Sequence, residues 1–508
     1  MISNIHSAIP CGFEGKIVEV EGDINKGLPA FNIVGMANKT INEARERVRS
    51  AVVSSGFCFP NKKVTINLAP ADLEKDGSCL DLPIALSTLI LSGQLLNGDV
   101  TNKLFAGELS LNGSLKPIKG AINIVEAAKN AGITEVYLPR DNLAQASLIS
   151  GVKIYGVDTI RNLFLHLKNQ SVVLKTNTDT KIGMNAIDRT ASDVLLDHIC
   201  GQKLAKRAIE IAVAGHHNIL ISGPPGAGKT LLAKAAANLL PALTAKETVE
   251  ITKIYSIAGL ATDGIISARP FRGPHHTASA ISIIGGGAGA LPGEASLAHK
   301  GILFLDEIPE FPRSVLEALR QPLEDKVISV SRANRKNTYP ADFMLVATMN
   351  PCPCGYLGDS AHECKCSETQ IQNYQRKMSG PLMDRIDLYI EAERVDNAEL
   401  FTGKSTRRGN EHSVVKNTIT DAILRQRARF GRDGVFNSSL SSFEASSKLT
   451  MDDSARRILL EASEKLRLSA RSYFKTIKVA QTIADLEGSS YIGSNHVAEA
   501  LTYRNRNA

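Results

Sequence analysis

NILISGPPGAGKTLLAKAAANLL, residues 218–240, places a glycine-rich loop between a short apolar strand and a helix. The loop has the pattern Gly-x-x-x-x-Gly-Lys-Thr. Such glycines let consecutive backbone N–H groups surround phosphates, and the N-terminus of the helix adds a positive dipole end. The strand–loop–helix order argues against an ordinary glycine turn, so the stretch predicts a nucleoside triphosphate site with Mg²⁺. The predicted nucleotide-binding residues are Gly223, Pro224, Pro225, Gly226, Ala227, Gly228, Lys229 on the β and γ phosphates, and Thr230 on Mg²⁺.

Two further apolar strands end in polar residues that suit hydrolysis. GILFLDEIPEF, residues 301–311, ends in Asp306, which we expect to contact Mg²⁺, and in Glu307, which suits polarising an attacking water. The alternative is a strand end with solvated acids. DFMLVATMN, residues 342–350, ends in Asn350, which is placed to orient that water.

Two arginines are candidates for completing the hydrolytic site. Arg385, in SGPLMDRIDLYI, precedes an apolar edge strand. An arginine supplied by a neighbouring subunit can neutralise charge on the γ-phosphate, although a plain salt bridge is the alternative. Arg471, which opens RSYFKTIKVAQ, is interpreted as closing over the nucleotide from the C-terminal helices.

Half of the cysteines lie in one polar segment, NPCPCGYLGDSAHECKCSE, residues 350–368. Cys352, Cys354, Cys364 and Cys366 offer four thiolates, the ligand set of a closed tetrahedral zinc site. One-residue spacing within each pair is shorter than the usual zinc spacing, and His362 is a possible substitute ligand. Reduced unliganded thiols and a redox pair are the alternatives to zinc.

The totals and the pattern along the chain indicate a multidomain α/β protein. The 508 residues suggest two to four domains, and the net charge of +7 permits nucleic-acid binding without establishing it. The sequence shows no secretory signal and no convincing membrane span, which predicts a cytoplasmic protein without persistent disulfides. The expected parts are an α+β domain at 1–170, a linker at 171–192, an α/β nucleotide core at 193–395 with a Cys-rich loop at 352–366, a connecting segment at 396–445 and helices at 446–508.

Together these motifs resemble an AAA+ ATPase. The run from Arg269 to Phe311 resembles the magnesium-chelatase-like branch, and nearly the whole chain is similar to the ComM/YifB family. The resemblance implies a Lon-protease-like N-terminal domain, an AAA+ core and a helical lid. It also implies a hexameric ring that moves DNA and promotes branch migration in recombination and natural transformation. On this resemblance, the Walker A, Walker B, sensor 1, arginine-finger and sensor 2 positions are Lys229, Thr230, Asp306, Glu307, Asn350, Arg385 and Arg471.

The resemblance to Lon protease makes peptidase activity a hypothesis for the N-terminal domain. That chemistry needs a Ser nucleophile and a Lys base. NLAPADLEKDGSCLDLPIAL, residues 67–86, aligns Cys79 with the nucleophile, with Ser78 beside it, and Ile122 falls at the lysine position. We therefore expect a non-proteolytic domain with Cys79 as a small buried residue.

The function hypotheses are a DNA-translocating ATPase, an AAA+ chaperone that remodels a protein partner, and, weakened by Ile122, an ATP-dependent protease. Arg269, Arg272 and His275 are candidate contacts to DNA phosphates. The alternative is that they belong to a flexible surface loop without a role in binding. The arginines of 425–432 are a second candidate, against a solvated charged face.

Overall fold

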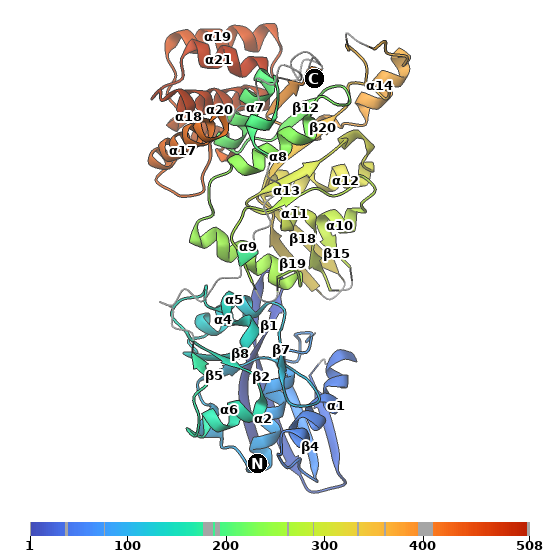
Figure 1. Ribbon diagram of the computed structural model, residues 1–508, viewed down its shortest axis with the longest axis vertical. Helices are drawn as coiled ribbons and strands as arrows, with labels where there is room; N and C mark the ends of the chain where they lie inside the picture. Colours follow the sequence, from blue (N-terminus) through green and yellow to red (C-terminus); the bar gives the residue numbers. More distant parts are fainter. Residues whose placement is uncertain are drawn as a thin grey trace.

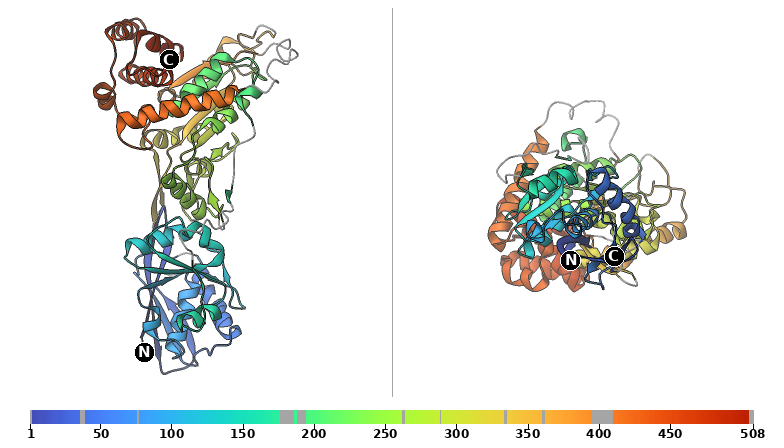
Figure 2. Two further views of the ribbon diagram at one scale, coloured as in Figure 1. Left: turned by 60° about the vertical axis from the view of Figure 1, so that its left-hand side comes forward. Right: turned by 90° about the horizontal axis from the view of Figure 1, so that it is seen from below.

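The computed structural model of the protein describes residues 2–35, 39–75, 77–175, 186–187, 194–261, 264–287, 289–332, 335–359, 362–394 and 410–504. Three parts follow one another along its longest axis. The N-terminal domain occupies one end, the nucleotide core lies in the middle, and the C-terminal helices lie beside the far end of the core (Figure 1). A second view shows the same order (Figure 2). Most of the predicted linker at 171–192 falls outside the described residues.

The N-terminal domain is built on one mixed sheet of eight strands. Their order is β10 (Leu174–Lys175), β9 (Lys153–Val157), β8 (Glu135–Pro139), β5 (Lys103–Phe105), β1 (Ile2–Cys11), β2 (Glu14–Asn25), β4 (Lys63–Ala69) and β3 (Ala30–Val34). β1 and β2 form a long antiparallel hairpin, whereas β5, β8 and β9 run parallel. The other elements are α1 (Lys39–Ser54), α2 (Asp81–Leu91), α3 (Asn97–Val100), β6 (Glu108–Leu109), β7 (Leu115–Lys116), α4 (Ala121–Asn130), α5 (Leu143–Ala146) and α6 (Ile160–Leu167).

Helix α2 explains the most apolar run of the sequence. Every residue of DLPIALSTLIL is buried, so the run is a core helix of this domain. It packs on β1 and β2, and its apolar side chains join a cluster that extends across the sheet. The sequence prediction of an α+β domain agrees with this arrangement, and its Lon-like character remains a prediction.

The core contains a parallel five-stranded sheet. Its order is β14 (Phe271–Arg272), β17 (Ile302–Leu305), β20 (Met344–Met349), β12 (Ile219–Ser222) and β21 (Leu388–Glu391). The three central strands are buried along their whole length, as expected for a sheet covered on both faces. This sheet and its helices confirm the α/β core. All of its strands end at the same edge, where polar residues that follow them meet.

Different elements cover the two faces of this sheet. One face packs on α7 (Lys203–Gly215), α8 (Lys229–Leu239) and the C-terminal helices, and the other on α12 (Arg313–Ala318) and α13 (Arg320–Asp325). The remaining elements are β11 (Ala186–Ile187), α9 (Ala245–Ile257), β13 (Ile265–Ile266), α10 (Ala280–Ile284), β15 (Gly285–Gly286), β16 (Leu291–Pro292), α11 (Glu294–Leu297), β18 (Val327–Arg332), β19 (Arg335–Pro340), α14 (Glu368–Arg376) and α15 (Gly380–Met383).

The C-terminal part is helical from Glu411 onward. Its helices are α17 (Glu411–Phe430), α18 (Ser442–Lys448), α19 (Asp453–Lys465), α20 (Ala470–Glu487) and α21 (Ser494–Thr502). α17 lies inside the segment expected to connect the core to helices at 446–508, but it packs against α7 and α20. Its stability comes from this packing and not from a strong amphipathic pattern.

Helix α9 joins the core to the N-terminal domain. The Lys253 ammonium binds Glu126 at 2.6 Å and lies 3.9 Å from the centre of the Phe13 ring. The Ser256 hydroxyl donates to Gln145 at 2.7 Å and accepts the Gly120 N–H at 3.0 Å. The contact is therefore built from buried, specific polar pairs. Over the described part of the chain, no helix has the length and apolar character needed to cross a bilayer.

Candidate active site

The glycine-rich loop lies between β12 and α8, as the sequence predicts. Gly226 and Gly228 have φ angles of +82° and +79°, which side-chain-bearing residues rarely adopt. Gly223 meets a different constraint, because an added Cβ would lie 2.4 Å from the Ala392 carbonyl oxygen. The glycines are thus required by backbone conformation and by close packing, and the helix N-terminus faces the loop.

Lys229 is held inside this loop. Its side-chain nitrogen donates to the carbonyl oxygens of Gly223 at 2.5 Å and Pro224 at 3.0 Å, and to Asn350 Oδ1 at 3.0 Å. Burial lowers the pKa of Lys229, an effect that Asp306 and Glu307 oppose. The Lys229 ammonium therefore joins the glycine-rich loop, which follows β12, to Asn350, which follows β20.

Asp306 lies at the tip of β17 and receives two hydroxyl groups. Thr230 Oγ1 donates to one carboxylate oxygen at 3.3 Å, and Thr348 Oγ1 donates to the other. Thr348 in turn accepts the Glu307 N–H at 3.0 Å. Hydroxyl and carboxylate oxygens are ligands that Mg²⁺ prefers, so Thr230 and Asp306 form a suitable pair. Thr348 was missed by the sequence analysis, because a threonine inside an apolar strand carries no distinctive signal.

Arg385 and Arg471 lie elsewhere in the same subunit. Both line a cavity of about 390 Å³ at the amino edge of the core sheet, together with Asn218, which precedes β12. The glycine-rich loop is at the carboxyl edge, and a four-residue strand spans about 13 Å. Arg471 therefore lies away from the nucleotide loop of its own subunit, and its role at a nucleotide remains a prediction. Helix α20 packs against α7, and this places its first turn beside Arg385.

The cysteine cluster is compact and borders the nucleotide loop. Sγ atoms of Cys352 and Cys354 lie 3.3 Å apart, and each lies 3.6 Å from that of Cys364. With Cys366 the four sulfurs all lie within 4.8 Å of one another. A tetrahedral zinc with bonds of about 2.3 Å separates its sulfurs by about 3.8 Å. The donor set and its spacing therefore fit a zinc ion, despite the short sequence spacing.

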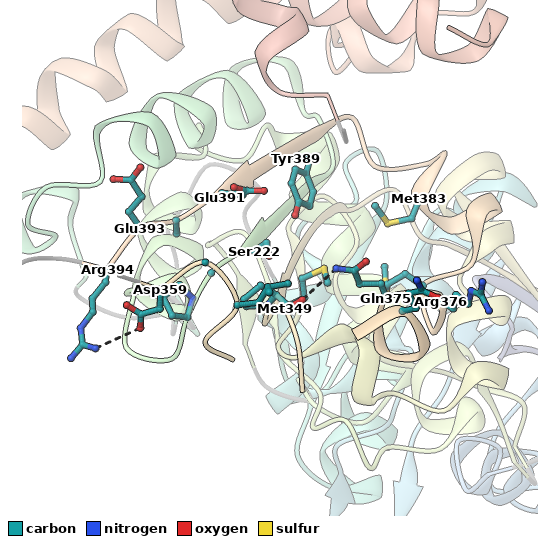
Figure 3. A pocket seen from close by; sticks show the side chains of 18 of the residues that line it. Ser222, Met349, Asp359, Gln375, Arg376, Met383, Tyr389, Glu391, Glu393 and Arg394 are labelled. Atoms are coloured by element: carbon teal, nitrogen blue, oxygen red, sulfur yellow. Dashed lines mark hydrogen bonds and ion pairs between the residues drawn. The ribbon is translucent and has the colours of Figure 1, made fainter. Parts of the chain in front are cut away.

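Two observations connect this cluster to the nucleotide loop. A Cβ added to Gly355 would lie 2.7 Å from Pro225 Cδ, so the cysteine loop packs directly on the glycine-rich loop. Both loops also border a cavity of about 960 Å³. Figure 3 shows this cavity, with Asp359 and Arg394 at one end and Arg376 at the other. Hydrogen bonding by the Tyr356 N–H, the largest cause, lowers the pKa of the Cys354 thiol to about 6, whereas burial and the neighbouring thiols raise the pKa of Cys364 and Cys366. Without a metal the cluster therefore favours one thiolate, and a metal would have to displace the protons of the other thiols.

The candidate DNA contacts are mostly engaged in the fold. The Arg269 side chain is only 8% exposed, binds Glu247 at 3.0 Å and donates to the Lys300 carbonyl at 2.7 Å, so the expectation that it contacts phosphates is wrong. Arg272 makes a bidentate pair with Glu294 at 2.6 and 2.7 Å, and His275 is exposed. In the second candidate region, Arg425 and Arg429 contact the Asp485 backbone and side chain, which favours a structural reading there.

The N-terminal domain does not assemble the Ser–Lys pair of a peptidase at the aligned positions. Cys79 is 5% exposed and Ile122 is fully buried, which confirms that Cys79 is a small buried residue. Ser78 donates to Glu108, and Lys75, which is also buried, donates to the Pro70 carbonyl. The lysine in this loop is thus bound to backbone.

Comparisons with known proteins cover almost the entire chain. A model described as magnesium chelatase, subunit ChlI, matches residues 195–400, one described as subunit ChlI of Mg-chelatase matches 20–142, and one for the ChlI C-terminal region matches 409–504. Competence protein ComM of Haemophilus influenzae is 39% identical over 508 residues, covering 98% of this chain and 97% of that protein. YifB of Escherichia coli is 39% identical over 504 residues, covering 99% and 97%.

A more distant similarity links the chain to a protein whose name refers to DNA replication. DNA replication licensing factor mcm-6 of Caenorhabditis briggsae is 22% identical over 363 residues, covering 67% of this chain and 40% of that protein. The long, near-complete matches at 39% identity are decisive for the family. The chain belongs to the ComM/YifB-type magnesium-chelatase-like family of AAA+ ATPases.

Proposed function

We propose that this protein is a ring-forming motor that hydrolyses ATP and moves along DNA, driving branch migration in recombination and natural transformation. The observation that carries the proposal is the separation of the catalytic groups within one subunit. Lys229 and Asp306 lie at the carboxyl edge of the core sheet, whereas Arg385 and Arg471 line a cavity at the amino edge. One subunit cannot bring both sets to one nucleotide, but neighbours in a ring can.

In this scheme each residue has a defined role. Lys229 neutralises the β and γ phosphates, Thr230 and Asp306 hold Mg²⁺, and Glu307 with Asn350 positions the attacking water. Arg385 and Arg471 of the neighbouring subunit stabilise charge that develops on the γ-phosphate. A hexamer in the cytoplasm is the assembly we expect.

Three features support DNA as the partner. The net charge is +7, and the core carries two hairpins, β15–β16 and β18–β19, which contact each other. Lys336 is exposed on β19, and His275 is exposed in the segment that precedes α10. The printed names of two relatives refer to competence and to DNA replication. An exposed lysine on a hairpin suits sequence-independent contact with phosphates.

The second candidate function is ATP-driven remodelling of a protein partner. It is favoured by the matches to magnesium chelatase subunit models across both the core and the C-terminal helices. A synthetic four-way DNA junction separates the two candidates. A DNA motor resolves the junction only with hydrolysable ATP and hydrolyses ATP faster when DNA is added. If DNA does not change the rate of ATP hydrolysis at low salt, under conditions where the ring assembles, protein remodelling is favoured.

The cysteine cluster is proposed to hold a structural zinc ion. Cys352, Cys354, Cys364 and Cys366 would bind it as thiolates, a set that closes the coordination shell and leaves no open position for catalysis. The ion would supply a cross-link that fixes the loop carrying Gly355 against Pro225. The test is metal analysis of the purified protein and of cysteine variants.

A further inference from the structure

The cavity at the amino edge of the core sheet is rich in cations. It is lined from α13, α20, the segment 438–442 and the residues that precede three strands. Its charged lining residues are Glu324, Lys326, Asp342, Asp384, Arg385, Asp387, Arg471, Lys475 and Lys478. Arg471, Lys475 and Lys478 share one face of α20, because they follow helical spacing. The basic residues only slightly outnumber the acids, so the pairs that they form determine which cations are free to meet an anion.

The two lysines of α20 are tied to backbone. Lys475 donates to the Ile386 carbonyl at 2.5 Å, and Lys478 donates to the Ser438 carbonyl at 3.2 Å. Burial lowers the pKa of both lysines. Asp342 is likewise paired, with Lys300 at 2.6 Å and Lys326 at 3.0 Å. Arg385 is also tied to backbone, because its Nη1 donates to the Pro381 carbonyl at 2.6 Å. Arg385 and Arg471 differ from the lysines in sharing one carboxylate as their anionic contact.

That carboxylate belongs to Glu324, in the last turn of α13. One of its oxygens accepts a hydrogen bond from Arg385 Nη2, and the other lies 3.9 Å from Arg471 Nη1. Arg385 is only 9% exposed, and its buried Nε has no hydrogen-bond partner, whereas Glu324 is 52% exposed. The more solvent-exposed partner is thus the acid, and the arginine retains an unused donor in its Nε–H. A phosphate has more oxygens and more charge than a carboxylate, so it can satisfy both arginines better.

We propose that Glu324 is a positioning residue that holds Arg385 and Arg471 in the separate subunit and is displaced by the γ-phosphate of ATP bound to the neighbouring subunit. This inference rests on the proposed ring. ADP lacks the γ-phosphate and cannot displace Glu324 in the same way. Glu324 therefore makes assembly selective for the triphosphate, because the arginines exchange one anionic partner for another only when ATP is present.

The test measures assembly, without DNA, in the Glu307→Gln background so that ATP persists. Sedimentation or mass photometry gives the ATP and ADP concentrations at half-maximal assembly. Glu324→Gln should lower the ATP midpoint by about two- to fivefold, the range expected from a half-exposed ion pair. It should also reduce the preference for ATP over ADP. Asp325→Asn is the matched control, because Asp325 is exposed, adjacent and outside the lining of the cavity.

A double-mutant cycle separates this role from a structural one. In an Arg385→Ala background, Glu324→Gln should have a smaller effect than in the presence of Arg385. A Glu324→Gln variant that needs more ATP to assemble, or that behaves like Asp325→Asn, overturns the proposal while leaving the ring intact. Failure of the parent Glu307→Gln protein to assemble with ATP is a different result, because it refutes the shared site itself and Glu324's role with it.

Discussion

Thr348, on β20, donates a hydrogen bond to Asp306, which follows the adjacent parallel strand β17. The same hydroxyl oxygen accepts the backbone N–H of Glu307. One buried threonine thereby orients the proposed Mg²⁺ ligand and fixes the backbone of the residue proposed to activate water. Glu307 has a φ of +52°, a conformation that needs support from its surroundings.

Replacing Thr348 with valine should lower ATP turnover roughly five- to hundredfold, because the Glu307 N–H loses its acceptor and Asp306 loses a donor. The shape of the side chain is nearly preserved, so the protein should still fold and bind nucleotide. Thr348→Ser keeps the hydroxyl and should retain most activity. Steady-state hydrolysis assays measure both variants. Equal activities for the valine and serine variants would show that the hydroxyl has no role.

The residues at the glycine-rich loop and Asp306 were predictable because each motif ends a buried parallel strand, and such ends meet at one edge. Thr348 was not predictable, since its role depends on which strand neighbours β17. The position of Arg471 also depends on tertiary packing: α20 docks on α7 and places Arg471 beside Arg385. From the sequence, Arg269 was expected at the surface. In the fold it pairs with Glu247 of α9, a contact that depends on tertiary packing.

Lys229→Ala should reduce ATP hydrolysis by roughly hundredfold or more, because the γ-phosphate loses a preorganised cation. Its neighbours on the loop remain, so the fold should persist. Lys234→Ala, on the same helix α8 but outside the described contacts to Asn350, is the matched control. Circular dichroism checks folding and a phosphate-release assay measures turnover. Undiminished hydrolysis by Lys229→Ala would contradict the assignment of the loop.

Arg385→Ala should bind ATP with near-normal affinity and hydrolyse it slowly, because in the proposed ring the arginine serves the neighbouring subunit's nucleotide. Mixing this variant with Lys229→Ala should restore part of the activity, since some interfaces then combine an intact loop with an intact arginine. Arg457→Ala removes an exposed arginine from α19 and should leave turnover unchanged. The readout is turnover against mixing ratio. An absence of recovery at every ratio argues against a shared site.

The purified protein should contain about one zinc per chain, because the four thiolates form a closed site. Cys364→Ser combined with Cys366→Ser should abolish the metal and loosen the loop against Pro225, which lowers thermal stability. Cys58→Ser, an exposed cysteine outside the cluster, should keep it. Elemental analysis after purification without chelators measures the content. Metal-free wild-type protein would leave the reduced-thiol and redox interpretations.

Glu307→Gln should bind ATP and a DNA junction without resolving it, because the γ-phosphate stays in place and the water is not activated. Binding should fall at least tenfold between about 50 and 200 mM salt and depend weakly on base sequence, since phosphate contacts release counterions. Lys336→Glu should weaken binding, because this exposed residue on β19 would then repel phosphates, whereas Lys129→Glu, exposed on α4 in the N-terminal domain, should not. Fluorescence anisotropy with labelled junctions measures all three variants. Equal weakening by both charge reversals would mean that net charge, and not the β18–β19 hairpin, governs the interaction.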